Sequence, residues 1–169
     1  MDLLPAIVSR RSAKRFDSRP VSTQCLERIL QAGRLAPSAK NRQEWRFIVV
    51  SRADLREKLA AASFGAEQIE TASAVIAVCT TNVDYRMPNG QVSYPVDLGI
   101  AAAFMMLQAT HEGVASCAMT TFDEQEVQDL LSMPHAMRVV VMLALGYTDQ
   151  QPAAQTRKPL SDIVAYNHW

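Results

Sequence analysis

The sequence predicts a layered fold of the α/β or α+β class, formed by a single domain. Short runs of β-branched and apolar residues alternate along the chain with longer segments of helical pattern. The 169 residues show no internal repeat, no low-complexity tract and no interdomain linker. A compact domain of this length can bury roughly two thirds of its unfolded surface, so we expect it to fold without disulfides or metals.

Helices are expected at residues 3–9, 22–36, 54–62, 96–112 and 123–131, and strands at residues 45–50, 74–80, 115–119 and 138–145. Ser22 is a candidate N-cap for the second helix, and Pro37 disfavours helical geometry in the residue before it. The helix at 96–112 is apolar on nearly every side. We therefore expect it to be central and covered all round.

Two segments lie outside this pattern. Residues 82–95 are rich in Asn, Asp, Pro, Gly and Tyr, which predicts a long loop and makes it the best candidate for a lid. The tail, residues 150–169, opens with polar residues and prolines but closes with Ile163, Val164, Tyr166 and Trp169. We therefore expect the apolar end of the tail to pack on a surface, either of its own domain or of a partner subunit.

Charge and cysteine usage limit the classes of partner. Lys plus Arg equals Asp plus Glu at 17 each, so no global field attracts nucleic acid or an anionic membrane. No apolar run approaches membrane-spanning length, and the first residues lack the pattern of a secretory leader. Cys25, Cys79 and Cys117 have no metal or redox spacing and are expected to be buried free thiols. These features predict a cytoplasmic protein with no nucleic-acid partner and no membrane partner.

Three polar segments are candidates for a binding site. Residues 10–15 place four cations and a hydroxyl within six positions, a set that suits a phosphate monoester but is also typical of a solvated basic turn. A second basic pair, Arg157 and Lys158, lies near the end of the chain. Residues 36–45 offer hydroxyl, amide and backbone groups, which suit the edge of a flavin or base, although ordinary capping and turn chemistry explains them equally well.

The constellations of other enzyme classes are missing. The six glycines form neither a dinucleotide-binding fingerprint nor a phosphate-binding loop of the Walker type. His111 and Glu112 lack the second histidine of a zinc protease motif, and with only His135 and His168 besides, a metal cage or serine triad is disfavoured. We expect the histidines to be surface or packing residues. The reactivity would then come from a cofactor.

Taken together, these segments resemble the nitroreductase family of flavoproteins in its short form. The resemblance rests on motifs that occur in the family's order and run essentially from end to end. They are residues 10–16, residues 36–47, residues 97–101 with 107–109, and residues 144–147 with 157–160.

The resemblance implies an α+β fold of three layers, with a mixed, mostly antiparallel sheet between helices. Residues 1–169 would form one nitroreductase-like domain. It also implies an obligate homodimer that binds flavin mononucleotide (FMN) at its interface, with the tail, residues 150–169, crossing to the partner and adding to its sheet. Residues near 10 and 157 would come from one subunit and residues near 38 from the other.

Carried over residue by residue, the resemblance implies that Arg10, Ser12 and Arg157 bind the FMN phosphate, with Arg11 near the phosphate or ribityl chain. Lys14 would reach the pyrimidine edge of the flavin, where a cation stabilises the negative charge of the reduced ring and raises its potential. The partner would supply contacts to the ring and ribityl chain from Pro37, Ser38, Ala39 and Asn41, and Gln68 would add an amide contact. Thr120 and Thr121 replace the glycine that relatives often carry, and their backbone would pass the ring.

The implied reaction is a ping-pong exchange with no catalytic side chain. NAD(P)H would give a hydride to flavin N5 and leave, and a small organic acceptor, a nitroaromatic or a quinone, would then take its place. Relatives that fragment flavin or dehalogenate aromatics use added lid elements or specific polar residues, and the short loop at residues 82–95 shows nothing decisive for these activities. The alternative is a flavin-binding carrier or redox sensor without turnover, whereas nucleic-acid binding is disfavoured by the neutral charge and the lack of an aromatic platform.

Overall fold

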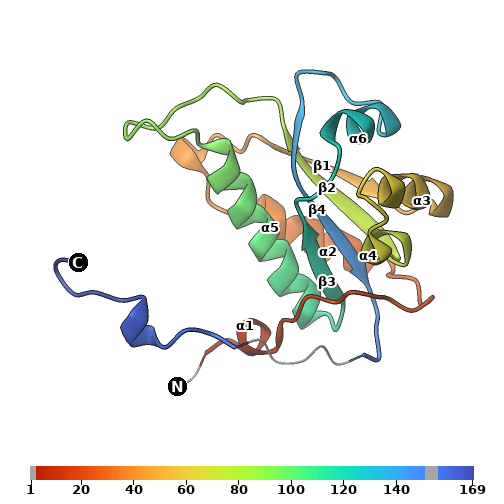
Figure 1. The fold of residues 1–169 in the computed structure, drawn as a ribbon, viewed down its shortest axis with the longest axis horizontal. Coiled ribbons are helices and arrows are strands. Elements are labelled where there is room, and N and C mark those ends of the chain that lie inside the picture. Colours follow the sequence, from red (N-terminus) through yellow and green to blue (C-terminus); the bar gives the residue numbers. More distant parts are fainter. Residues whose placement is uncertain (1–2, 151–155) are drawn as a thin grey trace.

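The computed structural model describes residues 3–150 and 156–169, and Figure 1 shows the arrangement of its elements. The α-helices are α1 (Pro5–Ser9), α2 (Thr23–Arg34), α3 (Ala53–Ala61), α4 (Glu67–Glu70), α5 (Tyr94–His111) and α6 (Glu124–Leu130). The strands are β1 (Trp45–Val50), β2 (Ala74–Thr80), β3 (Ala115–Met119) and β4 (Arg138–Gly146). Two short 3-10 helices complete the set, η1 (Ala39–Asn41) and η2 (Leu160–Asp162).

The sheet is antiparallel rather than mixed. Its strand order is β1-β2-β4-β3, and each neighbouring pair runs antiparallel. Within the described ranges, the one parallel pairing is an isolated bridge between Ser12 and Ser116, beside the edge strand β3. The expectation of a mixed sheet is therefore wrong for these strands, because nothing longer than that bridge lies parallel to the β3 edge.

Both faces of the sheet are buried, which confirms the three-layer α+β arrangement. All of β2 is buried, and its side chains alternate between the two faces as those of any strand do. Ile76 and Val78 face the core shared with α2 and α5, whereas Val75 and Ala77 face the core shared with α3, α4 and α6. Figure 1 shows these two helical layers on either side of the strands.

Helices α2 and α5 pack closely together. The Ser22 side chain accepts a hydrogen bond from the Cys25 N–H at 3.2 Å, which confirms Ser22 as the cap of α2. Gly33 permits the close approach of the helices, because a Cβ there would lie 2.8 Å from Cγ of Met105. Helix α5 begins at Tyr94 and accommodates Pro95 in its first turn, where proline lacks only an N–H that needs no partner.

The expectation that α5 is covered all round is wrong for the single chain. Leu98 and Met105 are fully buried against the sheet and α2, but Val96 and Phe104 are 46% and 39% exposed. One face of this apolar helix therefore points away from the chain's own core. The other predicted elements agree with the structure to within a few residues, except that α4 was not predicted, since a four-residue helix has too few turns to show a periodicity.

The described part of the tail does not pack on its own domain. Figure 1 shows residues 156–169 extending away from the body, and Ile163, Tyr166 and Trp169 are 57%, 83% and 91% exposed. Residues 151–155 lie outside the described residues. No helix in the described ranges is both long and apolar enough to cross a membrane.

Buried cysteines and exposed histidines agree with the sequence. Cys25, Cys79 and Cys117 are free and buried, and burial is the main cause that raises the pKa of each thiol, to about 12 for Cys79. The histidines, His111, His135 and His168, are all exposed.

Candidate functional site

The N-terminal basic segment follows the edge strand β3. Ser12 forms the bridge to Ser116, and the Ala13 N–H donates to the Ser116 carbonyl at 3.1 Å. Ala13 is buried, while Ser12 is half-buried and Lys14 exposed, so the two polar neighbours lie on the outer side of this extended stretch. Nη1 of Arg10 donates to Oγ of Ser12 at 3.5 Å. The predicted phosphate ligands Arg10 and Ser12 are thus side by side.

The segment is held in place by Phe16. This ring is 5% exposed and lies against Gly146, where an added Cβ would come within 2.8 Å of Cδ1 of the ring. The absence of a side chain at Gly146 therefore allows the segment to lie close to the end of β4.

The same edge of the sheet has a positive potential and a buried hydroxyl group. Burial raises the pKa of the Cys117 thiol, and the charges of Lys14 and Arg10 act against that rise, so both cations lie within electrostatic range of β3. The Ser116 hydroxyl is buried and has no hydrogen-bond partner among the described residues. The Ser116 hydroxyl, beside Ser12, is therefore a hydrogen-bond donor that lacks an acceptor.

Arg11 is placed differently from its neighbours. Its Nη1 donates to the carbonyls of Val8 at 2.7 Å and Arg10 at 2.9 Å. A guanidinium in this position satisfies the free carbonyls at the C-terminus of α1 and opposes the helix dipole. In the single chain Arg11 caps α1, and its contact with a cofactor stays a prediction.

Gln68 lies near the other end of β3. It belongs to α4, and its Nε2 is 2.6 Å from Sδ of Met119, the last residue of the strand. Thr120 and Thr121 follow directly and are exposed. The structure therefore gathers one group along β3, which we call the β3 rim: Arg10, Ser12, Lys14, Gln68, Thr120 and Thr121.

The predicted residues at 37–41 form a tight turn around η1. The Ser38 hydroxyl accepts from the Gln43 N–H at 3.0 Å, and the Ser38 carbonyl accepts from the Asn41 N–H at 2.9 Å. Lys40, Asn41 and Gln43 have φ of 53°, 54° and 54°, in the left-handed region that few residues other than glycine adopt. Pro37 and Asn41 are exposed, whereas Ser38 and Ala39 are half-buried, so we call residues 37–43 the η1 turn.

One chain does not bring the η1 turn to the β3 rim. The turn leads into β1, which is the opposite edge of the sheet from β3. Three strand spacings of about 4.8 Å separate the two edges, or roughly 14 Å. Figure 1 likewise shows η1 near the start of α5, away from the N-terminal segment that passes β3.

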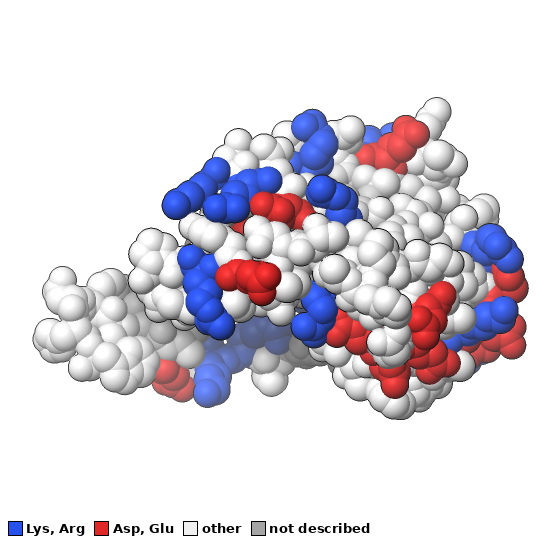
Figure 2. All heavy atoms as spheres, turned by 90° about the horizontal axis from the view of Figure 1, so that it is seen from above, with Lys and Arg blue, Asp and Glu red and all other residues white. Residues whose placement is uncertain are grey.

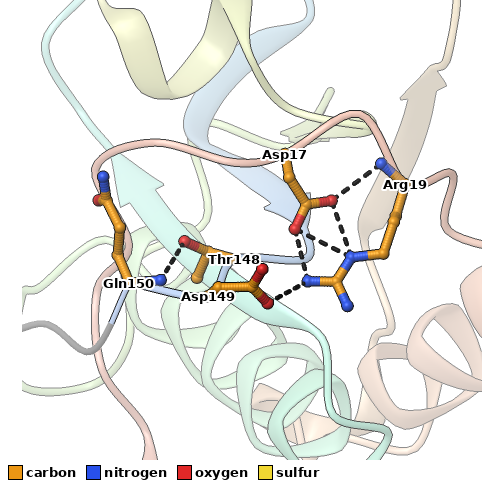
Figure 3. Close-up of polar contacts among 5 residues, drawn as sticks. All are labelled: Asp17, Arg19, Thr148, Asp149 and Gln150. Atoms are coloured by element: carbon orange, nitrogen blue, oxygen red, sulfur yellow. Dashed lines mark hydrogen bonds and ion pairs between the residues drawn. The ribbon is translucent and has the colours of Figure 1, made fainter.

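The tail leaves the domain beside the N-terminal segment. Nη2 of Arg19 lies 2.5 Å from Oδ2 of Asp17 and 2.7 Å from Oδ1 of Asp149, as Figure 3 shows. The Arg19 guanidinium holds the pKa of Asp17 below its ordinary value. Arg157 lies farther along the tail, where its Nη1 donates to the Thr156 carbonyl at 3.2 Å. Its convergence with Arg10 on one phosphate stays a prediction.

Two residues beside the η1 turn were given no role from the sequence, although Asp97 begins one of the motifs that carry the resemblance. The Asp97 carboxylate is 4% exposed and accepts from the Ala39 N–H at 3.0 Å. The Tyr85 ring, from the predicted lid loop, lies 3.9 Å from Cζ of Arg42 and 5.6 Å from Nζ of Lys40. Asp97 could have been identified as the one carboxylate in an otherwise apolar helix. No sequence feature indicates the contact of Tyr85, because it joins two loops that are distant in sequence.

The charges of the protein are balanced overall. On the face drawn in Figure 2, Lys and Arg lie among Asp and Glu, so this face has no continuous patch of one sign. Because Lys plus Arg equals Asp plus Glu at 17 each, the cations of the β3 rim attract an anionic group at short range rather than through a global field.

Comparisons with known proteins agree with one another. The model of the nitroreductase family matches residues 7–92 and 67–147. A nitroreductase family protein from Clostridium difficile 630 has a solved structure that is 30% identical, with full coverage of both chains and a TM-score of 0.88. The chain is 27% identical to an oxygen-insensitive NADPH nitroreductase of Helicobacter acinonychis, over 93% of this chain and 92% of that protein.

A further solved structure shares the fold. An FMN-dependent nitroreductase from Clostridium difficile R20291 is 24% identical over 97% of this chain and 98% of its own, with a TM-score of 0.84.

Proposed function

Because the chain belongs to the nitroreductase family, we propose that it is an FMN-dependent oxidoreductase that passes electrons from NAD(P)H to a small organic acceptor, such as a nitroaromatic or a quinone. The name of its relative from Helicobacter acinonychis supports the reduced nicotinamide as donor. The fold is also one that an FMN-dependent nitroreductase adopts, which supports the cofactor by analogy.

The observation that carries this proposal is the arrangement of Arg10, Ser12 and Ser116 at the β3 rim. A guanidinium and a hydroxyl lie 3.5 Å apart, next to a buried hydroxyl without a partner among the described residues. These donors fit the oxygens of a phosphate monoester, which accept several charge-assisted hydrogen bonds at once. Arg157 would add a second guanidinium from the tail.

The separation of the η1 turn from the β3 rim supports a site shared by two subunits. Pro37, Ser38, Ala39 and Asn41 would reach the flavin ring of the partner's site, because they lie at the far edge of their own sheet. The exposed apolar tail and the open face of α5 support the same homodimer.

Each group of residues has its own task. Bound FMN would supply hydride and electron transfer, first with the nicotinamide and then with the acceptor at the same place. The β3 rim would hold the phosphate and place Lys14 at the pyrimidine edge. Gln68, Thr120 and Thr121 would border the ring, and the η1 turn would cover it from the partner.

The test is FMN binding by the purified protein and two matched variants. We expect a flavin absorbance spectrum, and we expect Arg10→Ala to raise the Kd for FMN about tenfold or more, because a hydrogen bond to a charged group contributes roughly 1.5–3 kcal/mol. Arg15→Ala is the control: Arg15 lies in the same segment but pairs with Glu67 at 3.2 Å on the surface. The Kd of Arg15→Ala for FMN should change by about fivefold or less, since exposed ion pairs contribute roughly 0–1 kcal/mol.

Two outcomes would contradict the proposal. If the purified protein neither contains nor binds FMN, the proposed cofactor is wrong. If Arg10→Ala and Arg15→Ala change the Kd for FMN equally, the assignment of Arg10 to the phosphate site is wrong. Steady-state oxidation of NADPH or NADH with a quinone then separates an enzyme from a carrier or redox sensor, because a carrier is reduced once and does not turn over.

A further inference from the structure

Asp97 is a buried carboxylate with no task in the function proposed above. It lies in the first turn of α5 and is 4% exposed, beside the apolar residues Leu98 and Ala101. Among the described residues, no Lys, Arg or His forms an ion pair with it. Burying a charge in this way is unfavourable unless hydrogen bonds replace the lost water.

The Asp97 carboxylate binds the backbone of the η1 turn. Oδ1 of Asp97 accepts from the Ala39 N–H at 3.0 Å, across 58 positions of sequence. A backbone N–H bound to an ionised carboxylate forms one of the stronger hydrogen bonds in proteins. Asp97 also lies in the first turn of α5, where the positive end of the helix dipole favours the same charge.

The η1 turn needs such support. Lys40, Asn41 and Gln43 all have positive φ, although none is glycine. Each left-handed residue costs free energy and persists only where the surroundings fix it. Inside the turn, the Gln43 N–H donates to the Ser38 hydroxyl. The bond from the Ala39 N–H to Asp97 then anchors the turn to α5.

We propose that Asp97 is a positioning residue for the flavin site, whose carboxylate holds the η1 turn in the shape that contacts the cofactor; this inference rests on the proposed function. Because the Ala39 N–H donates to Asp97 and the Ala39 carbonyl accepts from the Arg42 N–H at 3.2 Å, Ala39 would contact the flavin through its methyl group. The Ser38 hydroxyl accepts from Gln43 and keeps its own hydrogen to donate. Asp97 therefore selects which groups of the turn face the ring.

The experiment compares wild type with Asp97→Ala, Asp97→Asn and Glu124→Ala. Glu124, the first residue of α6, is a matched control. Its Oε1 also accepts from a backbone N–H, that of Val139 on β4 at 2.9 Å, and it pairs with Arg138 away from the η1 turn. Hydrogen exchange of residues 38–43 is measured on the protein without FMN, and the Kd for FMN is measured separately. The first readout reports the turn itself and needs no activity.

We expect Asp97→Ala to speed exchange at Ala39 and raise the FMN Kd, each about tenfold or more. Asp97→Asn keeps a neutral acceptor, so its Kd should rise only about threefold, which is partial rescue. Glu124→Ala should change neither quantity. If Asp97→Ala does not fold, Asp97→Asn carries the test, and a Kd equal to that of wild type overturns the inference.

The remaining outcomes separate this inference from the function on which it rests. Faster exchange with an unchanged Kd would make Asp97 a structural residue only and overturn its positioning role. Wild-type protein that binds no FMN would overturn the proposed function and, with it, the role of Asp97. Wild-type protein that binds FMN while every variant binds equally well overturns the role of Asp97 alone.

Discussion

At the scale of single residues, Lys14 is the cation with the most specific predicted role. It lies on the exposed side of the segment along β3, and its charge reaches Cys117 on that strand. A positive charge beside the flavin pyrimidine would stabilise the reduced, anionic ring more than the oxidised ring. Its contribution would therefore appear in the redox potential rather than in affinity alone.

We expect Lys14→Met, which keeps the length and removes the charge, to lower the flavin midpoint potential and slow nicotinamide oxidation. Potentiometry on the FMN-loaded protein measures the shift. Arg15→Met is the matched control, since Arg15 is the neighbouring cation but forms an ion pair with Glu67. A potential equal to that of wild type would place Lys14 at the phosphate or in solvent.

Residue types and their order predicted where polar groups gather, but not what each side chain contacts. Arg10 and Ser12 do lie together, as their spacing indicates. Arg11 has the same charge and a neighbouring position, yet its guanidinium binds the carbonyls of α1. That difference depends on where α1 ends. The role of Asp97 depends on a contact across 58 positions, which local patterns do not contain.

At the scale of elements, an ion pair joins α2 to the end of α5. Nε and Nη2 of Arg28 donate to the two carboxylate oxygens of Glu112 at 2.7 Å each, and Gln108 donates to the same carboxylate at 2.8 Å. The bond from Arg28 is the main cause that lowers the pKa of Glu112 to about 2. Acidification should therefore weaken this junction between helices.

The direction of the pH effect follows from that lowered pKa. A carboxyl whose pKa is lower in the folded state stabilises the fold fully above its unfolded pKa of about 4.3, and this contribution is lost as the pH falls towards about 2. We expect urea denaturation to show a smaller loss of stability between these pH values in Arg28→Ala than in wild type. Arg34→Ala is the control, because Arg34 of the same helix binds Gln31. Equal pH dependence in wild type and Arg28→Ala would contradict the assignment.

The helices and strands themselves were largely predictable, because their periodicity and caps are local. Ser22 caps α2 as its position indicates, and β2 is buried along its whole length. The exposed face of α5 was not foreseen, since an apolar pattern indicates burial without saying whether the cover comes from the same chain. The expectation of a mixed sheet came from the family resemblance rather than from a local pattern, and the four strands of this chain pair antiparallel.

At the scale of the whole molecule, the apolar surfaces left open by one chain are the strongest argument for a dimer. They include the tail, with Ile163, Tyr166 and Trp169, and the outer face of α5, with Val96 and Phe104. Large apolar side chains that are exposed together on one segment are typical of protein interfaces. Arg19 fixes the start of the tail beside the N-terminal segment that we propose binds the phosphate, so a tail that crosses to a partner would link dimer formation to the site.

Truncation after Pro159 tests that link directly. A large aromatic side chain buries roughly 150–250 Å², and at about 25 cal/mol per Å² the burial of Trp169 alone would contribute up to about 4 to 6 kcal/mol to association. We therefore expect the truncated protein to be monomeric, to unfold at a lower temperature and to lose FMN. The single change Trp169→Ala should weaken the dimer in the same direction. Phe64→Ser is the matched control, since Phe64 lies beyond the C-cap of α3 and is 74% exposed.

Analytical ultracentrifugation with detection at a flavin wavelength measures the oligomeric state and the amount of bound FMN in the same sample. Because subunit association is governed by mass action, the series should be run over a range of protein concentrations. We expect the truncated protein to lose the dimer and its bound FMN together, because the β3 rim of one subunit would no longer lie beside the η1 turn of the other. A truncated protein that stays dimeric and yellow would make the tail peripheral, and a full-length monomer that retains FMN would contradict a site shared between subunits.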